Sequence, residues 1–147
     1  MTLLPDWREF IELLTAHAVE YVVVGAWARA FHGIPRSTGD IDFFVRRSPG
    51  NAQRLVRVLQ EFGFASLAID VEDFVTPDRV IQLGVDPYRI DILNTISGVT
   101  FDEAWDERVN GEIDGLPVPF LSLRLFKRNK RAAGRAKDIA DLDALPE

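Results

Sequence analysis

The sequence predicts a mixed α/β (α+β) domain in which helices flank a small mixed β-sheet. Residues 21–24 form a short, wholly apolar run rich in valine, which is typical of a buried strand. Residues 49–62 instead repeat apolar side chains such as Leu55 and Leu59 at helical spacing. The two kinds of pattern alternate along the chain, which favours helices packed on a sheet.

The other segments are assigned by the same signals of periodicity and turn composition. Helices are expected at residues 5–19, 25–31, 101–109, 123–133 and 136–145. Strands are expected at residues 40–45, 79–85 and 88–93, a loop at 32–39, and a hairpin of edge strands at 109–121. We expect a single domain over residues 1–147 that ends in two helices at about 122–145.

Composition limits where the protein works and what it binds. The chain is 47% hydrophobic and has no cysteine, so it can bury a core but can form neither a disulfide nor a thiolate metal site. Neither a secretion signal nor an apolar run of about 18 residues is found, so we expect a cytoplasmic protein without membrane contact. The net charge of −6 argues against indiscriminate binding of nucleic acid.

Basic residues are concentrated in one segment. Residues 121–137 hold seven lysines and arginines and no acid, whereas the rest of the chain is acidic. Such a segment indicates a local site for an anion. The alternative is a solvated basic face that pairs with the acidic body.

Asp40 and Asp42 are the leading candidates for chemistry. Side chains two apart in a strand lie on one face, about 6–7 Å apart along the backbone, and two carboxylates so placed repel each other unless a cation lies between them. The pattern alone is weak evidence, because Asp141 and Asp143 repeat it. The apolar residues around Asp40 and Asp42 strengthen the case, because acids close to a core need compensation.

Asp91 lies in a similar apolar strand. If the two strands are neighbours, Asp91 completes a three-carboxylate site for Mg²⁺ or Mn²⁺. The alternative is an ion pair between Asp91 and Arg89, two residues away.

Gly25 follows the buried strand at 21–24 and opens a helix. Unpaired amides at such a point can bind an anion, and glycine has no side chain to obstruct it. The alternative is a packing glycine at a tight turn. Arg36 and Thr38, in the following loop, are candidate phosphate contacts; alternatively, Arg36 pairs with an acid and Thr38 sets the turn into the strand.

These residues together resemble a known signature. Val-Val-Gly25-Ala26, thirteen further residues and then Asp40-Ile-Asp42-Phe is similar to the motif of the DNA polymerase beta-like nucleotidyltransferase superfamily, and Arg89-Ile-Asp91-Ile resembles the strand with its third carboxylate. More narrowly, the chain resembles the abortive-infection (AbiEii-like) nucleotidyltransferase toxins at Ala28, His32-Gly33, Arg36-Ser-Thr38 and Asp40-Ile-Asp42, and along the tail from Lys130 to Leu142. Position 26 is alanine where the superfamily has glycine or serine, so no hydroxyl is available there for a phosphate.

The resemblance implies transfer of a nucleoside monophosphate from a nucleoside triphosphate to an acceptor. Asp40, Asp42 and Asp91 would bind the metal, and Asp91 would also help to deprotonate the acceptor hydroxyl. Gly25 and Ala26 would hold the triphosphate, and the phosphates would be neutralised by three residues of the basic segment: Lys130, Arg135 and Lys137. The acceptor would be RNA, protein or a small molecule, with an antitoxin as a possible partner in a toxin–antitoxin or phage-defence setting.

Two other function classes are compatible with the same residues. One is a non-catalytic nucleotide-binding or antitoxin-like protein of the same fold. The other is a metal-dependent phosphodiesterase or nuclease, in which water replaces the acceptor.

Overall fold

The computed structural model describes residues 3–33, 39–64 and 67–146. Two of the predicted site residues, Arg36 and Thr38, lie outside these ranges. The helices are α1 (Pro5–Ala16), α2 (Gly25–Phe31), α3 (Pro49–Leu59), α4 (Val71–Val75), α5 (Phe101–Asp106), α6 (Leu123–Ala133) and α7 (Ala136–Ala144), with a π-helical segment η1 (Gln60–Phe64) directly after α3. The strands are β1 (Tyr21–Val24), β2 (Ile41–Val45), β3 (Val80–Leu83), β4 (Ile90–Leu93), β5 (Val109–Ile113) and β6 (Leu116–Phe120).

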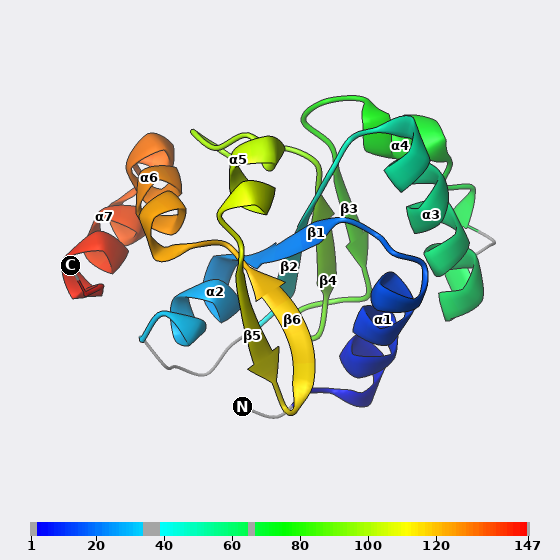
Figure 1. Cartoon of the computed structure of the whole chain (residues 1–147), viewed down its shortest axis with the longest axis horizontal. Coiled ribbons are helices and arrows are strands. Elements are labelled where there is room, and N and C mark those ends of the chain that lie inside the picture. The colour runs from blue at the N-terminus through cyan, green and yellow to red at the C-terminus, as the bar shows by residue number, and fades with distance from the viewer. Residues whose placement is uncertain (1–2, 34–38, 65–66, 147) are drawn as a thin grey trace.

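The six strands form one mixed sheet in the order β3-β4-β2-β1-β6-β5. The central strand β1 runs antiparallel to β2 and parallel to β6, while β2 runs parallel to β4. The predicted class, a small mixed sheet flanked by helices, is therefore confirmed. In Figure 1, helices α1, α3 and α4 gather on one side of the molecule, and α2, α6 and α7 gather on the other.

The alternation of side chains along β2 separates the core from the candidate site. Phe43 lies on the face that packs on α1, where its ring centroid is 5.4 Å from that of Phe10. Asp42 and Phe44 lie on the opposite face, and Phe44 meets Phe101 of α5 with centroids 5.2 Å apart. The acids of this strand are therefore presented on the face that α1 does not cover.

Helix α1 ends three residues before the predicted limit. It stops at Ala16 because Ala18 takes a positive φ of 54°, which no helix accommodates. The helix predicted over 49–62 runs as α3 to Leu59 and then continues as η1, within which Gly63 has a φ of 100°.

Helix α4 was not among the predicted elements. It has only five residues, and it is capped by reciprocal bonds between Asp70 and Asp73. Five residues are too few to show a helical repeat of apolar side chains.

The predicted hairpin at 109–121 is present, but only β5 is an edge strand. Strand β6 lies between β5 and β1, although it pairs with β1 only at Phe120 opposite Val23. Pro117 and Pro119 therefore interrupt no ladder with β1, which explains how two prolines fit into an inner strand.

Candidate active site

The strand register brings Asp42 and Asp91 side by side. Asp42 lies opposite Asp91 in the parallel β2–β4 pair and opposite Val24 in the β1–β2 pair. The carboxyl groups of the two aspartates are within hydrogen-bonding reach of each other. Asp40 lies just before β2, where its carboxylate accepts a bond of 2.9 Å from the backbone N–H of Arg89.

Gly25 packs directly against the Asp42 carboxylate. Its φ is +67°, and a Cβ at this position would lie 2.1 Å from Oδ2 of Asp42. Both the backbone conformation and the close approach require glycine here. The role of this residue as a packing glycine, one of the two interpretations of the sequence, is thus evident from the contact with Asp42.

One cavity of about 440 Å³ collects the predicted site residues. It is lined by all eight of those that the structure describes: Gly25, Ala26, Asp40, Asp42, Asp91, Lys130, Arg135 and Lys137. Arg29, Gly39, Arg89 and Asp141 complete its walls. The cavity joins carboxylates from the sheet to cations from α6 and α7, segments far apart in the sequence.

A second hollow of about 540 Å³ adjoins the first. The two share Gly25, Asp42, Lys130 and Arg135, and the second extends to Asn129 and other polar residues beside α6. Asp42 therefore stands where two spaces meet, each large enough for part of a substrate.

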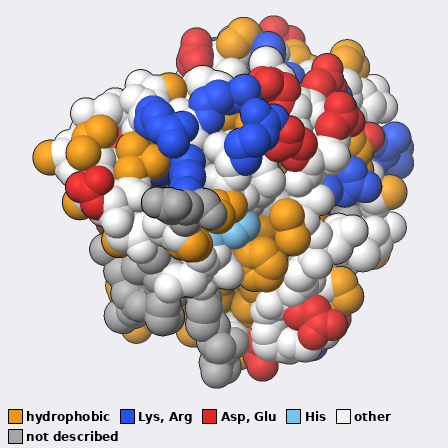
Figure 2. All heavy atoms as spheres, turned by 60° about the vertical axis from the view of Figure 1, so that its left-hand side comes forward, with side chains coloured by type: hydrophobic (Ala, Val, Ile, Leu, Met, Phe, Trp, Pro, Cys, Tyr) orange, Lys and Arg blue, Asp and Glu red, His pale blue; other side chains and the backbone are white. Residues whose placement is uncertain are grey.

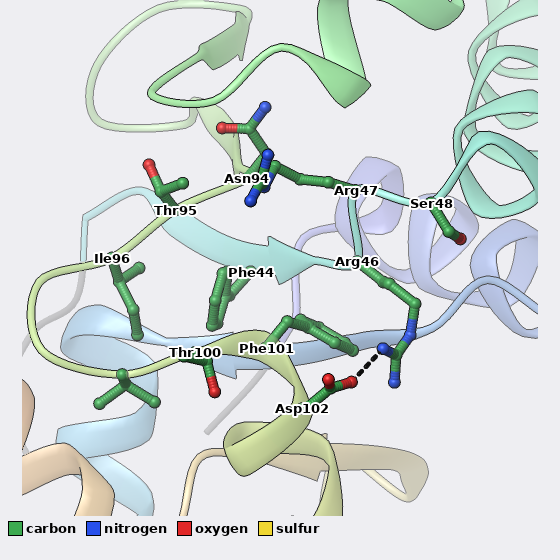
Figure 3. Close-up of a pocket in the computed structure, with 11 residues that line it drawn as sticks. Phe44, Arg46, Arg47, Ser48, Asn94, Thr95, Ile96, Thr100, Phe101 and Asp102 are labelled. Atoms are coloured by element: carbon green, nitrogen blue, oxygen red, sulfur yellow. Dashed lines mark hydrogen bonds and ion pairs between the residues drawn. The ribbon is translucent and has the colours of Figure 1, made fainter.

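A third hollow of about 420 Å³ lies beyond the second (Figure 3). Its floor includes Phe44 and Phe101, and Arg46 at its rim pairs with Asp102 and Glu20. None of the three predicted carboxylates lines it.

The electrostatics of the acids follow from burial and crowding. Burial raises the pKa of Asp42 to about 7, and the hydrogen bond and charge of Asp91 and the charge of Asp40 add to this effect. Burial likewise raises the pKa of Asp40. A divalent cation would relieve this repulsion, because it would favour the charged form of the crowded carboxylates.

Arg89 is the counter-charge of these acids. Its guanidinium donates to both oxygens of Asp91 at 2.6 and 3.1 Å and lies 3.1 Å from Oδ2 of Asp40. The alternative in which Asp91 pairs with Arg89 is therefore realised in the structure, alongside the approach of Asp91 to Asp42.

The donor set suits a hard divalent cation, because Asp42 and Asp91 offer adjacent carboxylate oxygens. Within residues 3–33, 39–64 and 67–146, however, no three acidic, histidine or cysteine side chains are already arranged around a common metal position. The metal site with Asp40, Asp42 and Asp91 stays a prediction.

Two cations of the cavity, Lys130 and Arg135, are held by a buried aspartate. Asp138 of α7 is fully buried and accepts from Nζ of Lys130 at 3.1 Å and from Nε of Arg135 at 2.7 Å. The bonds from Arg135 and Lys130 lower the pKa of Asp138. Figure 2 shows lysines and arginines gathered on the face that α6 and α7 contribute, with acidic side chains beside them.

The basic segment does not form one continuous helix, so its cations do not all face the same way. Gly134, with a φ of 67°, ends α6 in the left-handed conformation, so α7 begins in a new direction. Arg124 and Arg128 pair with Glu107 and Glu103 of the α5 region, and not with the cavity.

Sequence reasoning overlooked Arg29. It is 2% exposed, and its Nη1 donates to Oδ1 of Asp141 at 2.6 Å. Its only signal in the sequence was a charged residue among the small and apolar residues of α2. Lys130 lies 3.4 Å from the other oxygen of Asp141, so this aspartate joins α2, α6 and α7.

The six-stranded mixed sheet flanked by helices matches a nucleotidyltransferase-like fold. No family model matches the chain, and no curated protein matches its sequence. Among solved structures, a putative nucleotidyltransferase from Thermotoga maritima is similar over 97% of this chain and 94% of its own, with a TM-score of 0.61 and 20% sequence identity. At this identity the likeness establishes the fold. Among the described residues, no helix is both long enough and apolar enough to cross a bilayer.

Proposed function

We propose that this protein is a metal-dependent nucleotidyltransferase. One observation supports the proposal above all others: a single cavity unites Asp42 and Asp91 with Lys130, Arg135 and Lys137. Carboxylates suit the divalent metal and cations suit the polyphosphate of a nucleoside triphosphate, which are the two requirements of phosphoryl transfer.

In this proposal the acidic residues bind the metal and the basic residues bind the phosphates. Asp42 and Asp91, with Asp40, would hold Mg²⁺ or Mn²⁺, which when bound neutralises phosphate charge and polarises the reacting oxygens. Lys130, whose Nζ is fixed by Asp138, would offer its remaining N–H groups to phosphate oxygens.

The reaction joins an acceptor hydroxyl to the α-phosphorus. The new oxygen–phosphorus bond forms as the bond to pyrophosphate breaks, pyrophosphate leaves, and the hydroxyl proton passes to the Asp91 carboxylate. The second hollow, which also borders Asp42, is the proposed entrance for the acceptor. The acceptor is proposed to be RNA or protein, and a toxin–antitoxin setting rests on the sequence resemblance.

The activity is tested with the four nucleoside triphosphates, each labelled at the α-phosphate. Each is incubated with the protein, Mg²⁺ or Mn²⁺, total RNA and a cell lysate. Labelled RNA or protein together with released pyrophosphate is the expected result, and Asp42→Asn should abolish it. Release of unlabelled fragments without pyrophosphate would indicate a nuclease instead.

The role of the cations is tested by two pairs of variants. Lys137→Gln and Lys130→Gln remove charge inside the cavity, whereas Arg124→Gln and Arg128→Gln remove the same charge from residues paired with α5. We expect only the first pair to weaken triphosphate binding, most visibly at low salt. Lys137 is the sharper test of the two, because Lys130 also bonds to buried Asp138.

One observation favours a non-catalytic nucleotide-binding protein as the alternative. Arg89 already forms ion pairs with Asp40 and Asp91, so part of the charge of the acids is compensated without a metal. This alternative predicts triphosphate binding that is unchanged when EDTA removes divalent metal and unchanged in Asp42→Asn.

A further inference from the structure

Arg89 contacts more carboxylates than an arginine in an ordinary surface ion pair does. The aspartates at positions 40, 42 and 91 are called the acid cluster below. Its Nε and Nη2 bind both oxygens of Asp91, Nη2 also faces Asp40, and Nη1 lies 3.2 Å from Oδ1 of Asp86. Its backbone N–H donates to the other oxygen of Asp40. All three guanidinium nitrogens are therefore directed at carboxylates.

These contacts occupy the oxygens that a metal would need. Arg89 holds both oxygens of Asp91 and, through side chain and backbone, both of Asp40. A guanidinium at 2.6 to 3.1 Å from these oxygens repels a divalent cation and competes for the same lone pairs. In the described part of the chain no hydrogen bond or ion pair joins Arg89 to Asp42.

Asp86 is another, more exposed carboxylate with which the guanidinium of Arg89 can pair. Its side chain is 71% exposed, compared with 16% for Asp40 and 11% for Asp91. An arginine that leaves Asp91 and Asp40 can keep its pair with Asp86 while its head group moves toward solvent.

We propose that Arg89 is the resident counter-ion of the acid cluster and that a divalent metal binds by displacing its guanidinium from Asp91 and Asp40 toward Asp86. Arg89 thereby sets the metal affinity of the site and keeps the metal-free acids compensated. The inference rests on the metal site of the proposed function, and it concerns a positioning residue that acts through Asp91 and Asp40.

Calorimetric titration with Mn²⁺ alone tests this competition. Arg89→Gln should bind Mn²⁺ at least about tenfold more tightly than the wild-type protein, because one adjacent opposite charge changes such an equilibrium by about one unit or more on a logarithmic scale. The matched control is Arg79→Gln, which removes the same charge from an exposed arginine that lies 3.6 Å from Asp73. The control should leave the affinity within about twofold of wild type.

Asp86→Asn tests the direction of the movement. Asp86→Asn should weaken Mn²⁺ binding in the wild-type background. This effect should largely disappear in Arg89→Gln, because that variant has no displaced guanidinium for Asp86 to pair with. An Asp86 effect of equal size in both backgrounds would mean a simple loss of negative charge and would overturn the proposed movement.

A second readout follows the arginine itself. The Nε–H signal of Arg89 in a ¹H–¹⁵N spectrum should shift when diamagnetic Mg²⁺ is added, while that of Arg79 should not. If Arg89→Gln is less stable without metal, Mn²⁺ should raise its melting temperature more than it raises that of the wild type.

The outcomes separate the inference from the proposed function. Mn²⁺ binding that requires Asp42 but is equal in wild type and Arg89→Gln would overturn the inference and leave the metal site standing. No Mn²⁺ binding in either protein would overturn both.

Discussion

Asp42 combines burial with two acidic neighbours, so its charge is disfavoured in the folded protein. Its pKa rises from 3.8 to about 7, and the protein is therefore stabilised by the protonated form. This contribution is fully present below the unfolded pKa and is lost as the pH rises through the folded value.

Without metal, the free energy of unfolding should thus fall between about pH 4 and pH 7, by a few kcal/mol at most, since one pKa unit corresponds to about 1.4 kcal/mol. Asp42→Asn should flatten this decline and remove any stabilisation by Mn²⁺. Urea unfolding in EDTA and in Mn²⁺ at several pH values measures both effects. Asp143→Asn, at an exposed aspartate, is the control. A metal-induced shift that persists in Asp42→Asn would contradict the site.

Gly25 is the second residue on which the site depends. We expect Gly25→Ala to destabilise the protein through its positive φ, at about 1–3 kcal/mol, and through a clash with the Asp42 carboxylate. Gly115→Ala is a matched control, because Gly115 has a φ of +77° and open space where the Cβ would be. The excess loss in Gly25→Ala, measured by urea unfolding, reports the contact with Asp42. Equal losses in the two variants would mean that the carboxylate moves aside at no cost.

At the scale of elements, α2 and the two C-terminal helices are joined by charged groups away from solvent. Arg29 is buried in α2 and bonds to Asp141 of α7, while Nε and Nη2 of Arg29 find no hydrogen-bond partner among the residues that the structure describes. Lys130 of α6 contacts Asp138 and Asp141. The position of the cavity's cations therefore depends on α7.

Asp141→Ala should cost about 3–5 kcal/mol, because it leaves a buried guanidinium without a partner. Arg29→Met in the same chain should recover most of the loss, since it removes the buried charge. Urea denaturation of the two single variants and the double variant measures the coupling. The exposed Asp143→Ala serves as the control, and a similar small loss at positions 141 and 143 would refute the link.

At the scale of the whole molecule, β1 connects distant parts of the chain. It pairs with β2, which follows soon after it, and with β6, which comes about a hundred residues later. We therefore expect one cooperative unfolding transition, the behaviour of a single domain.

A chain cut after Arg108 loses β5, β6, α6 and α7. The buried strand β1 then lies at the edge of the sheet, with β2 on one side and no strand on the other. This shorter chain should not fold cooperatively. A chain cut after Arg135 keeps the complete sheet and should melt in one transition at a lower temperature. Near-ultraviolet circular dichroism and calorimetry distinguish these outcomes, and a native-like spectrum for the shorter chain would show that strands β1 to β4 and their helices are sufficient.

The sequence predicted best those features that depend on residues close together in the chain. The spacing of apolar side chains located α3 and the C-terminal helices, and strand alternation placed Asp40 and Asp42 on one face because neighbouring residues alone determine that pattern. Eight of the ten predicted site residues line one cavity, and the other two, Arg36 and Thr38, lie outside the described residues.

Tertiary structure decided what depends on residues far apart in the chain. The register of the parallel β2–β4 pair brings Asp91 beside Asp42, and no periodicity within either strand specifies that alignment. The bond between Arg29 and Asp141 spans α2 and α7, and Gly134 turns α7 back toward α6. The sequence by itself thus determined most of the elements and the candidate acids. The packing of those elements determined which cation pairs with which acid, because electrostatic pairing follows distance in space and not distance along the chain.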